Sequence, residues 1–207
     1  MAPTSTISPP SGRKAQATYR ALVENTHAVI AETGGFSGEL VAERARLSAA
    51  TFYAYFPSKD EALAAVLDGV LGDLVDRTID VFDIERLLED GLVAVVGRAV
   101  AVGFEVFTSS ALIFRLALAR LPESRTIRHV YRDHQARAVE ALERFVRLGR
   151  AAGKLSASDE AATTTALLVA LQGINNPLLL HRSATDASVA AVEEMIEHLL
   201  DPEHVRA

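Results

Sequence analysis

Residues 47–63, LSAATFYAYFPSKDEAL, crowd four aromatic side chains into five positions of a chain that has no Trp and only four Tyr. These aromatic residues are Phe52, Tyr53, Tyr55 and Phe56. Pro57 stops a helix, and Ser58 followed by acidic residues is typical of a helix start. The stretch therefore predicts a short helix ending at about Phe56 and a longer helix that begins at Ser58.

A second short helix is expected just before this one. Ser37 can cap a helix that runs to Arg44, and Ser48 can cap the helix that ends at Phe56. Only residues 45–47 separate the two helices, which is the spacing of a helix-turn-helix.

The second short helix has two different faces. Phe52 and Phe56 lie one turn apart and are expected to pack, with Leu47, against the first short helix. The opposite face is small in the middle and hydroxylated at its edges; it consists of Ala50, Ala54, Thr51 and Tyr53. Such a surface suits the major groove of DNA, because small side chains allow close approach and hydroxyls bond phosphates or base edges.

Helical spacing of apolar residues continues through most of the chain, and no alternating run persists, so we expect an all-α fold. The expected helices span residues 13–33, 37–44, 48–56, 58–81, 84–107, 110–121, 123–152, 159–182 and 186–200. Residues 1–12 have neither the basic nor the apolar segment of a signal peptide, and we expect a disordered tail.

The charge of the chain is unevenly distributed. The net charge is −6, but residues 1–60 hold six basic and five acidic residues, so an anionic partner is expected at the N-terminal quarter. The chain has no Cys, which fits a reducing compartment, and we expect a cytoplasmic protein. The apolar stretch 91–107 contains Arg98 and Glu105 and predicts a buried helix, not a membrane span.

The N-terminal quarter resembles the DNA-binding domain of the tetracycline-repressor-like (TetR) family of bacterial transcriptional regulators. The resemblance covers roughly residues 17–67 and rests on Ala42-Glu43-Arg44-Ala45, Leu47-Ser48, Thr51-Phe52-Tyr53, Tyr55-Phe56 and Ser58-Lys59-Asp60-Glu61-Ala62-Leu63. It implies a tail at 1–12, a helix-turn-helix DNA-binding domain at 13–67, and a larger helical effector-binding and dimerisation domain at 68–207.

The resemblance also implies which residues touch DNA. Groove-facing positions are Ser48, Ala49, Ala50, Thr51 and Tyr53, and phosphate contacts are expected from Tyr55 and Lys59. Arg46 stands where the family usually has Gly; it requires a turn that tolerates a side chain, and it adds a phosphate contact. Gly38 and Glu39 stand where many members carry polar or basic groove-facing residues, so no base contact is transferred to them.

Candidate ligand-binding residues in the larger domain are Phe104, Phe107, Phe114, Gln172, Asn175 and Asn176. Pro177 is expected inside a helix, where it frees polar backbone next to the three amides, and amides in an apolar helix can orient a ligand. The alternative is a kinked helix at a dimer interface with its amides paired across it. Gly91, Gly97 and Gly103 in one apolar helix indicate a close helix crossing or a cavity.

The sequence offers no catalytic or metal site. The six His do not share a face, and there is no nucleophile motif or phosphate-cradling Gly loop, so we expect neither an enzyme nor a metal or other cofactor. The prediction is a homodimeric repressor that binds a palindromic double-stranded DNA operator and is released by a lipophilic small molecule. By the resemblance, the dimer forms through the last two long helices, 159–182 and 186–200. The alternative is a helical sensor or scaffold whose head no longer binds DNA.

Overall fold

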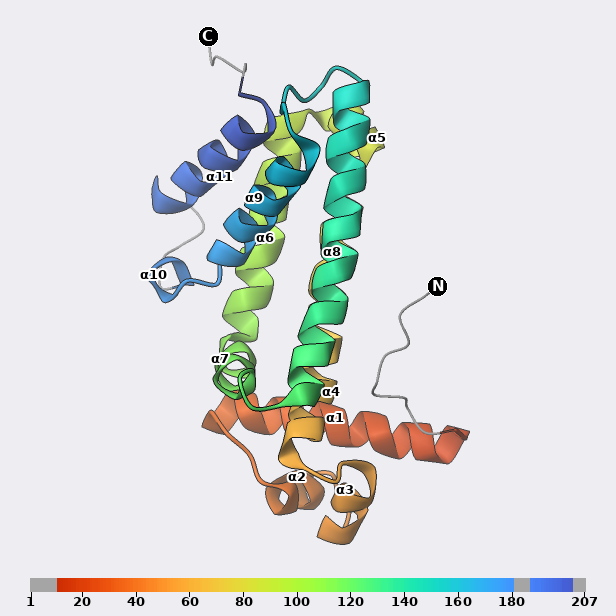
Figure 1. The fold of residues 1–207 in the computed structure, drawn as a ribbon. Helices are drawn as coiled ribbons and strands as arrows, with labels where there is room; N and C mark the ends of the chain where they lie inside the picture. The colour runs from red at the N-terminus through yellow and green to blue at the C-terminus, as the bar shows by residue number, and fades with distance from the viewer. Residues whose placement is uncertain (1–10, 181–186, 203–207) are drawn as a thin grey trace. The chain divides into compact units, whose positions relative to one another are not determined.

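The computed structural model describes residues 11–180 and 187–202, and every regular element in these two ranges is a helix (Figure 1). The helices are α1 (Arg13–Thr33), α2 (Gly38–Arg44), α3 (Ala49–Tyr55), α4 (Lys59–Val81), α5 (Ile84–Asp90), α6 (Leu92–Ser109), α7 (Ala111–Arg120), α8 (Arg125–Ala151), α9 (Glu160–Gly173), α10 (Pro177–Leu180) and α11 (Ala187–Leu200). The all-α prediction is confirmed.

The chain folds as two compact units. Unit 1 contains the residues up to Gly72 together with Ser110–His134, and unit 2 contains Asp73–Ser109 and the residues from Gln135 onward. Both α4 and α8 contribute to each unit. The predicted domain boundary at residue 67 falls within α4 and stays a prediction.

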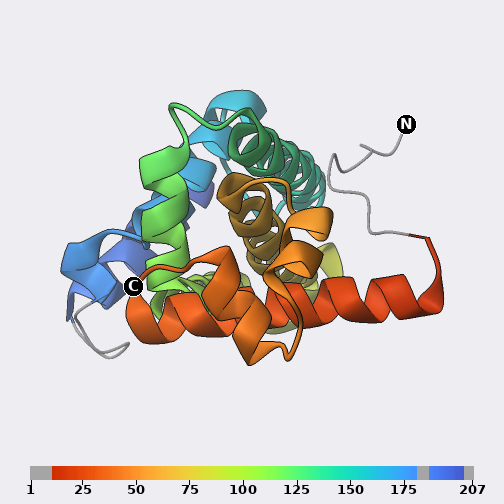
Figure 2. The same ribbon diagram turned by 90° about the horizontal axis from the view of Figure 1, so that it is seen from below.

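The core of unit 1 holds the helix-turn-helix against α1. Figures 1 and 2 show α2 and α3 together on one side of α1, and α2 contacts both α1 and α3. Phe52 and Phe56 are almost fully buried, with ring centroids 5.7 Å apart, and Tyr19 of α1 lies 5.3 Å from Phe56. Fully burying a Phe side chain contributes about 1.5–3 kcal/mol, so these rings anchor α3 to the unit. The predicted core role of both phenylalanines is confirmed.

Unit 1 also includes a segment far away in the sequence. Arg120 at the end of α7 donates to both carboxylate oxygens of Asp60 in the first turn of α4, at 3.0 and 3.1 Å. Further along, His134 of α8 lies 2.8 Å from Asp68 of α4. The Arg120–Asp60 and His134–Asp68 contacts hold residues 110–134 against α4.

Tyr19 of α1 lies in the same unit. Burial raises the pKa of Tyr19 to about 12, with the charge of Asp68 adding to the effect.

Unit 2 is centred on α6, which packs against α5, α9 and α11. By length and composition α6 could cross a membrane, but core helices of soluble proteins pass the same test. Its two charged side chains are ion-paired: Arg98 with Asp90, and Glu105 with Arg77 of α4.

One expected helix, 84–107, is two helices in the structure. Gly91 separates α5 from α6 with φ of +82°, a conformation that glycine adopts without steric cost. Gly103 lies where α6 meets α9: a Cβ atom there would come within 3.1 Å of the Ile174 side chain. The close crossing predicted from these glycines is therefore present at Gly103.

The expected helix 159–182 is also divided, and its predicted continuation through Pro177 is wrong. A turn at Ile174-Asn175-Asn176 follows the end of α9, and Pro177 is the first residue of α10. Proline is common at a first helical position, because its missing N–H has no intrahelical partner there. Residues 181–186 lie outside the described ranges, as do residues 1–10 of the predicted tail and residues 203–207.

Candidate nucleic-acid interface

Helix α3 is held at its start by the predicted cap. The Ser48 hydroxyl accepts a hydrogen bond from the Thr51 backbone N–H at 3.1 Å, and the two hydroxyls are 2.8 Å apart. Ser37 caps α2 in the same way through the Leu40 N–H. Both hydroxyls satisfy donors that have no partner inside a helix. The local sequence therefore fixes where each short helix begins.

With Phe52 buried, α3 presents its other side to solvent. Ser48, Ala50, Tyr53 and Ala54 are exposed, whereas Ala49, Thr51 and Tyr55 are half-buried. Of the face expected from the sequence, Ala50, Ala54 and Tyr53 are thus exposed, whereas Thr51 at its other edge is half-buried. Of the proposed groove-facing residues, Ala49 and Thr51 are the less accessible.

The turn between α2 and α3 contains an unusual backbone conformation. Arg46 has φ of +56°, and it is the one residue other than glycine with positive φ within residues 11–180 and 187–202. This left-handed conformation disfavours residues that carry a Cβ atom. The turn therefore holds Arg46 in an energetically unfavourable backbone conformation. The Arg46 side chain is exposed.

Tyr53 is tied to the start of α2. Its hydroxyl donates to Glu39 Oε1 at 3.1 Å. The backbone N–H of Glu39, and then the hydroxyls of Tyr53 and Ser37, lower the pKa of the Glu39 carboxyl. The hydrogen bond between Tyr53 and Glu39 also raises the pKa of Tyr53. Sequence reasoning treated Tyr53 and Glu39 separately, because no local signal links residues fourteen positions apart.

Gly38 makes this contact possible. A Cβ atom on Gly38 would lie 2.7 Å from the Phe52 ring and 2.9 Å from Cζ of Tyr53. Gly38 is buried, so it is not available as a groove-facing position. The absence of a side chain lets both rings rest against the first turn of α2.

Lys59 is exposed at the first residue of α4, and its ammonium lies 5.1 Å from the centre of the Phe36 ring. The Ser58 hydroxyl accepts from the Glu61 backbone N–H at 3.3 Å, as the predicted cap requires. A cation beside a helix N-terminus is favourable for binding a phosphate. Arg13 and Lys14 at the start of α1 are also exposed.

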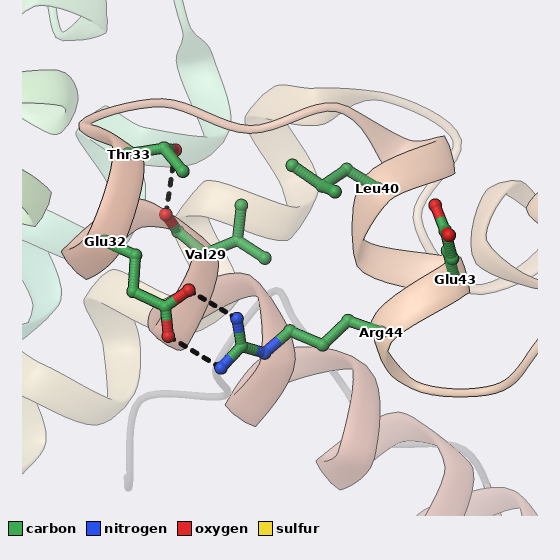
Figure 3. A pocket seen from close by; sticks show the side chains of 6 residues that line it. All are labelled: Val29, Glu32, Thr33, Leu40, Glu43 and Arg44. Carbon is green, nitrogen blue, oxygen red and sulfur yellow. Dashed lines mark hydrogen bonds and ion pairs between the residues drawn. The ribbon is translucent and has the colours of Figure 1, made fainter.

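Arg44, in contrast, is already neutralised. Its guanidinium donates to both carboxylate oxygens of Glu32, at 2.5 and 2.7 Å, as Figure 3 shows. The pair borders a hollow of about 300 Å³ between α1 and α2, with lining residues Val29, Glu32, Thr33, Leu40, Glu43 and Arg44. A bidentate pair holds the arginine side chain in place, so Arg46 and Lys59 are the positively charged side chains near α3 that are left for phosphate contacts.

The candidate ligand-binding residues are distributed over both units. Phe104 and the buried Phe107 are on α6 of unit 2, whereas the buried Phe114 is on α7 of unit 1. Gln172 is in the last turn of α9, and Asn175 and Asn176 follow it in the turn before α10. Ile174, which contacts Gly103, brings this turn beside the aromatic part of α6.

Three or more His, Asp or Glu side chains arranged to hold a metal ion are not found in the described part of the chain. His134 is buried and paired with Asp68, and His129 lies 3.3 Å from Asp133. His181 and His204 lie outside the described residues.

A family model described as bacterial regulatory proteins, tetR family, matches residues 22–66. Residues 22–66 therefore carry the helix-turn-helix of the TetR family. The matched segment contains α2, α3 and the start of α4, and with them all eight predicted DNA-binding residues. The TetR-family resemblance read from the sequence is confirmed, together with its helix-turn-helix head.

Solved structures share the fold over almost the whole chain. A putative TetR-family transcriptional regulator from Mesorhizobium loti is 19% identical, with a TM-score of 0.71, covering 92% of this chain and 96% of its own. A SmeT–triclosan complex is 18% identical, with a TM-score of 0.64, covering 87% of this chain and 90% of its own. The flavonoid-responsive regulator FrrA is 24% identical, with a TM-score of 0.63, covering 89% of this chain and 93% of its own. No curated protein sequence matches the chain.

Proposed function

We propose that this protein is a cytoplasmic homodimeric TetR-family repressor, which binds a palindromic DNA operator and is released by a lipophilic small molecule. The proposal rests mainly on the position and the exposed surface of α3. It is capped at Ser48, anchored by buried Phe52, and exposes a surface of small and hydroxyl side chains. A helix with such a surface can approach base edges closely in the major groove.

Phosphate contacts are assigned to the side chains around α3. Lys59 and Arg46 supply exposed positive charge, and Tyr55 supplies a hydroxyl. The groove-facing members of the proposed interface are Ser48, Ala49, Ala50, Thr51 and Tyr53. Arg44 is excluded from it because Glu32 occupies its guanidinium. Two such heads would reach successive major grooves about 34–36 Å apart.

The proposed dimer interface uses α9 and α11, which pack against each other in unit 2. Val169 of α9 and Met195 of α11 are large apolar side chains that expose 62% and 52% of their surface. Apolar side chains on two neighbouring helices favour a self-complementary contact with a second copy.

The proposed effector contacts are Phe104, Phe107, Phe114, Gln172, Asn175 and Asn176. Two neighbours of the same fold are described as a triclosan complex and a flavonoid-responsive regulator, which supports a small-molecule ligand here. Because α4 is one uninterrupted helix from Lys59 to Val81, a ligand at these residues can act on the head through it. The ligand shifts the equilibrium only by its difference in affinity for the two states.

Footprinting on the DNA that flanks the protein's own gene tests the proposal. We expect a protected palindrome whose half-sites are one helical turn apart, and loss of protection when the effector is added. A protein that binds small molecules but protects no DNA would be the sensor or scaffold of the alternative hypothesis.

A further inference from the structure

Tyr53 and Glu39 form a pair on the exposed side of the helix-turn-helix. Tyr53 exposes 41% of its surface, and Glu39 is exposed at the first turn of α2. Their side chains meet through one hydrogen bond, from the Tyr53 hydroxyl to Glu39 Oε1 at 3.1 Å. Any base or phosphate that reaches the end of Tyr53 therefore also meets the Glu39 carboxylate.

The hydrogen bond has one possible direction when the carboxylate is ionised. An ionised carboxylate can only accept, and a phenol has a single O–H to donate. The backbone N–H of Glu39 and, after it, the bond from Tyr53 lower the pKa of the Glu39 carboxyl, so the ionised form is favoured at neutral pH. With its proton committed to Glu39, the Tyr53 oxygen can only accept a further hydrogen bond.

This pair is therefore an acceptor-only surface, and DNA offers few donors to it. Phosphates and the keto oxygens of guanine and thymine are acceptors, so they cannot bond to the pair. The donors in the major groove are the amino groups of adenine N6 and cytosine N4. We propose that the Glu39–Tyr53 pair determines specificity, by selecting an amino base, adenine or cytosine, over a keto base at one position of each half-site. The proposal rests on the proposed function.

Packing holds the pair in place. The Tyr53 ring meets the Phe52 ring edge-on at a centroid distance of 5.2 Å, and Gly38 leaves room for both rings against α2. Ser37 caps α2 directly before this point, so the backbone that carries Glu39 is fixed as well. A positioned acceptor discriminates between bases better than a mobile one, because little ordering is needed on binding.

The test starts with selection from a pool of randomised DNA duplexes by the wild-type protein. We expect one position in each half-site at which adenine or cytosine is enriched over guanine or thymine by about five- to tenfold, the effect of one hydrogen bond. Replacing that adenine by 2-aminopurine, whose amino group lies in the minor groove, or that cytosine by 2-pyrimidinone, removes the major-groove amino group. Each replacement should weaken wild-type binding by the same factor.

Three variants assign the effect. Tyr53→Phe keeps the ring and loses the acceptor, so the base analogue should no longer weaken binding. Glu39→Ala frees the phenol proton to donate, so keto bases should be tolerated at that position and binding to phosphates should strengthen. Glu43→Ala is the matched control, because it removes the same charge from α2 without touching Tyr53; its base preference should equal that of the wild type.

The inference is overturned if the wild-type protein selects a clear operator and Tyr53→Phe or Glu39→Ala leaves every base preference unchanged. It is also overturned if the position nearest Tyr53 prefers guanine or thymine. Failure of the wild-type protein to enrich any duplex would instead reject the proposed function, and the inference with it.

Discussion

Replacement of Arg46 by glycine should stabilise the protein and weaken its binding to DNA at the same time. Arg46 adopts φ of +56° in the turn between α2 and α3. A residue with a Cβ atom costs about 1–2 kcal/mol in this conformation, and glycine avoids that cost. The greater freedom of glycine in the unfolded chain offsets about 0.5–1 kcal/mol. The net expectation is a gain of about 0.5–1 kcal/mol in the free energy of unfolding.

The same substitution removes an exposed positive charge from the proposed interface. If Arg46 contacts one phosphate, its loss lowers the slope of log affinity against log salt concentration by about 0.9. Arg46→Ala separates the two effects, because alanine loses the charge but keeps the Cβ atom in the left-handed conformation. The alanine variant should show the weaker salt dependence without the gain in stability.

Tyrosine fluorescence during urea unfolding is a suitable assay. The chain has no Trp, and its four tyrosines, Tyr19, Tyr53, Tyr55 and Tyr131, all belong to unit 1. The signal therefore reports on the unit that contains the turn. Arg46→Gly should raise the urea midpoint at an unchanged m-value. A lower midpoint for glycine, or an equal gain for alanine, would refute the argument from backbone strain.

Three further substitutions test separate contacts. Gly38→Ala places a Cβ atom 2.7 Å from the Phe52 ring and should destabilise unit 1 by about 1–3 kcal/mol in the same urea assay, whereas Gly35→Ala, which meets open space, should not. Arg120→Ala removes the hydrogen bonds that lower the pKa of Asp60, so it should reduce the urea midpoint at pH 7. That stabilisation is complete above the ordinary carboxyl pKa of about 4 and is lost as the pH falls through the lowered pKa of Asp60, so the difference from wild type should shrink over that range; a constant difference would contradict the ion pair. Val169→Asp should convert the proposed dimer to a monomer by light scattering, while Leu88→Asp, equally polar and on exposed α5, should remain dimeric.

Local signals in the sequence were sufficient to predict the helix-turn-helix. Ser37, Ser48 and Ser58 cap the helices as their positions predict, and Phe52 and Phe56 form the core. At Arg46 the sequence predicted a turn that tolerates a side chain, whereas the structure has positive φ there, a conformation that disfavours a Cβ atom. These features depend on residues that are neighbours along the chain, and such features can be predicted from a single sequence.

Contacts between distant residues were not predicted. Arg120 and Asp60 are sixty positions apart, and nothing local to either residue indicates the other. The Tyr53–Glu39 and Arg44–Glu32 pairs were missed for the same reason, although they decide which polar groups of the head remain available. Gly91 and Pro177 were taken as interruptions within helices, but they separate one helix from the next.

The most direct test of DNA recognition by α3 and its surroundings is the salt dependence of binding. Affinity for the flanking DNA would be measured at several salt concentrations for wild type, Tyr53→Ala, Lys59→Ala and, as a matched lysine control in unit 2, Lys154→Ala. We expect tight wild-type binding that weakens with salt, weaker binding for the two head variants, and a salt slope reduced by about 0.9 for Lys59→Ala alone. Binding that is absent, or that is unaffected by both head substitutions, would contradict the assignment of α3 and Lys59 as the DNA-reading surface.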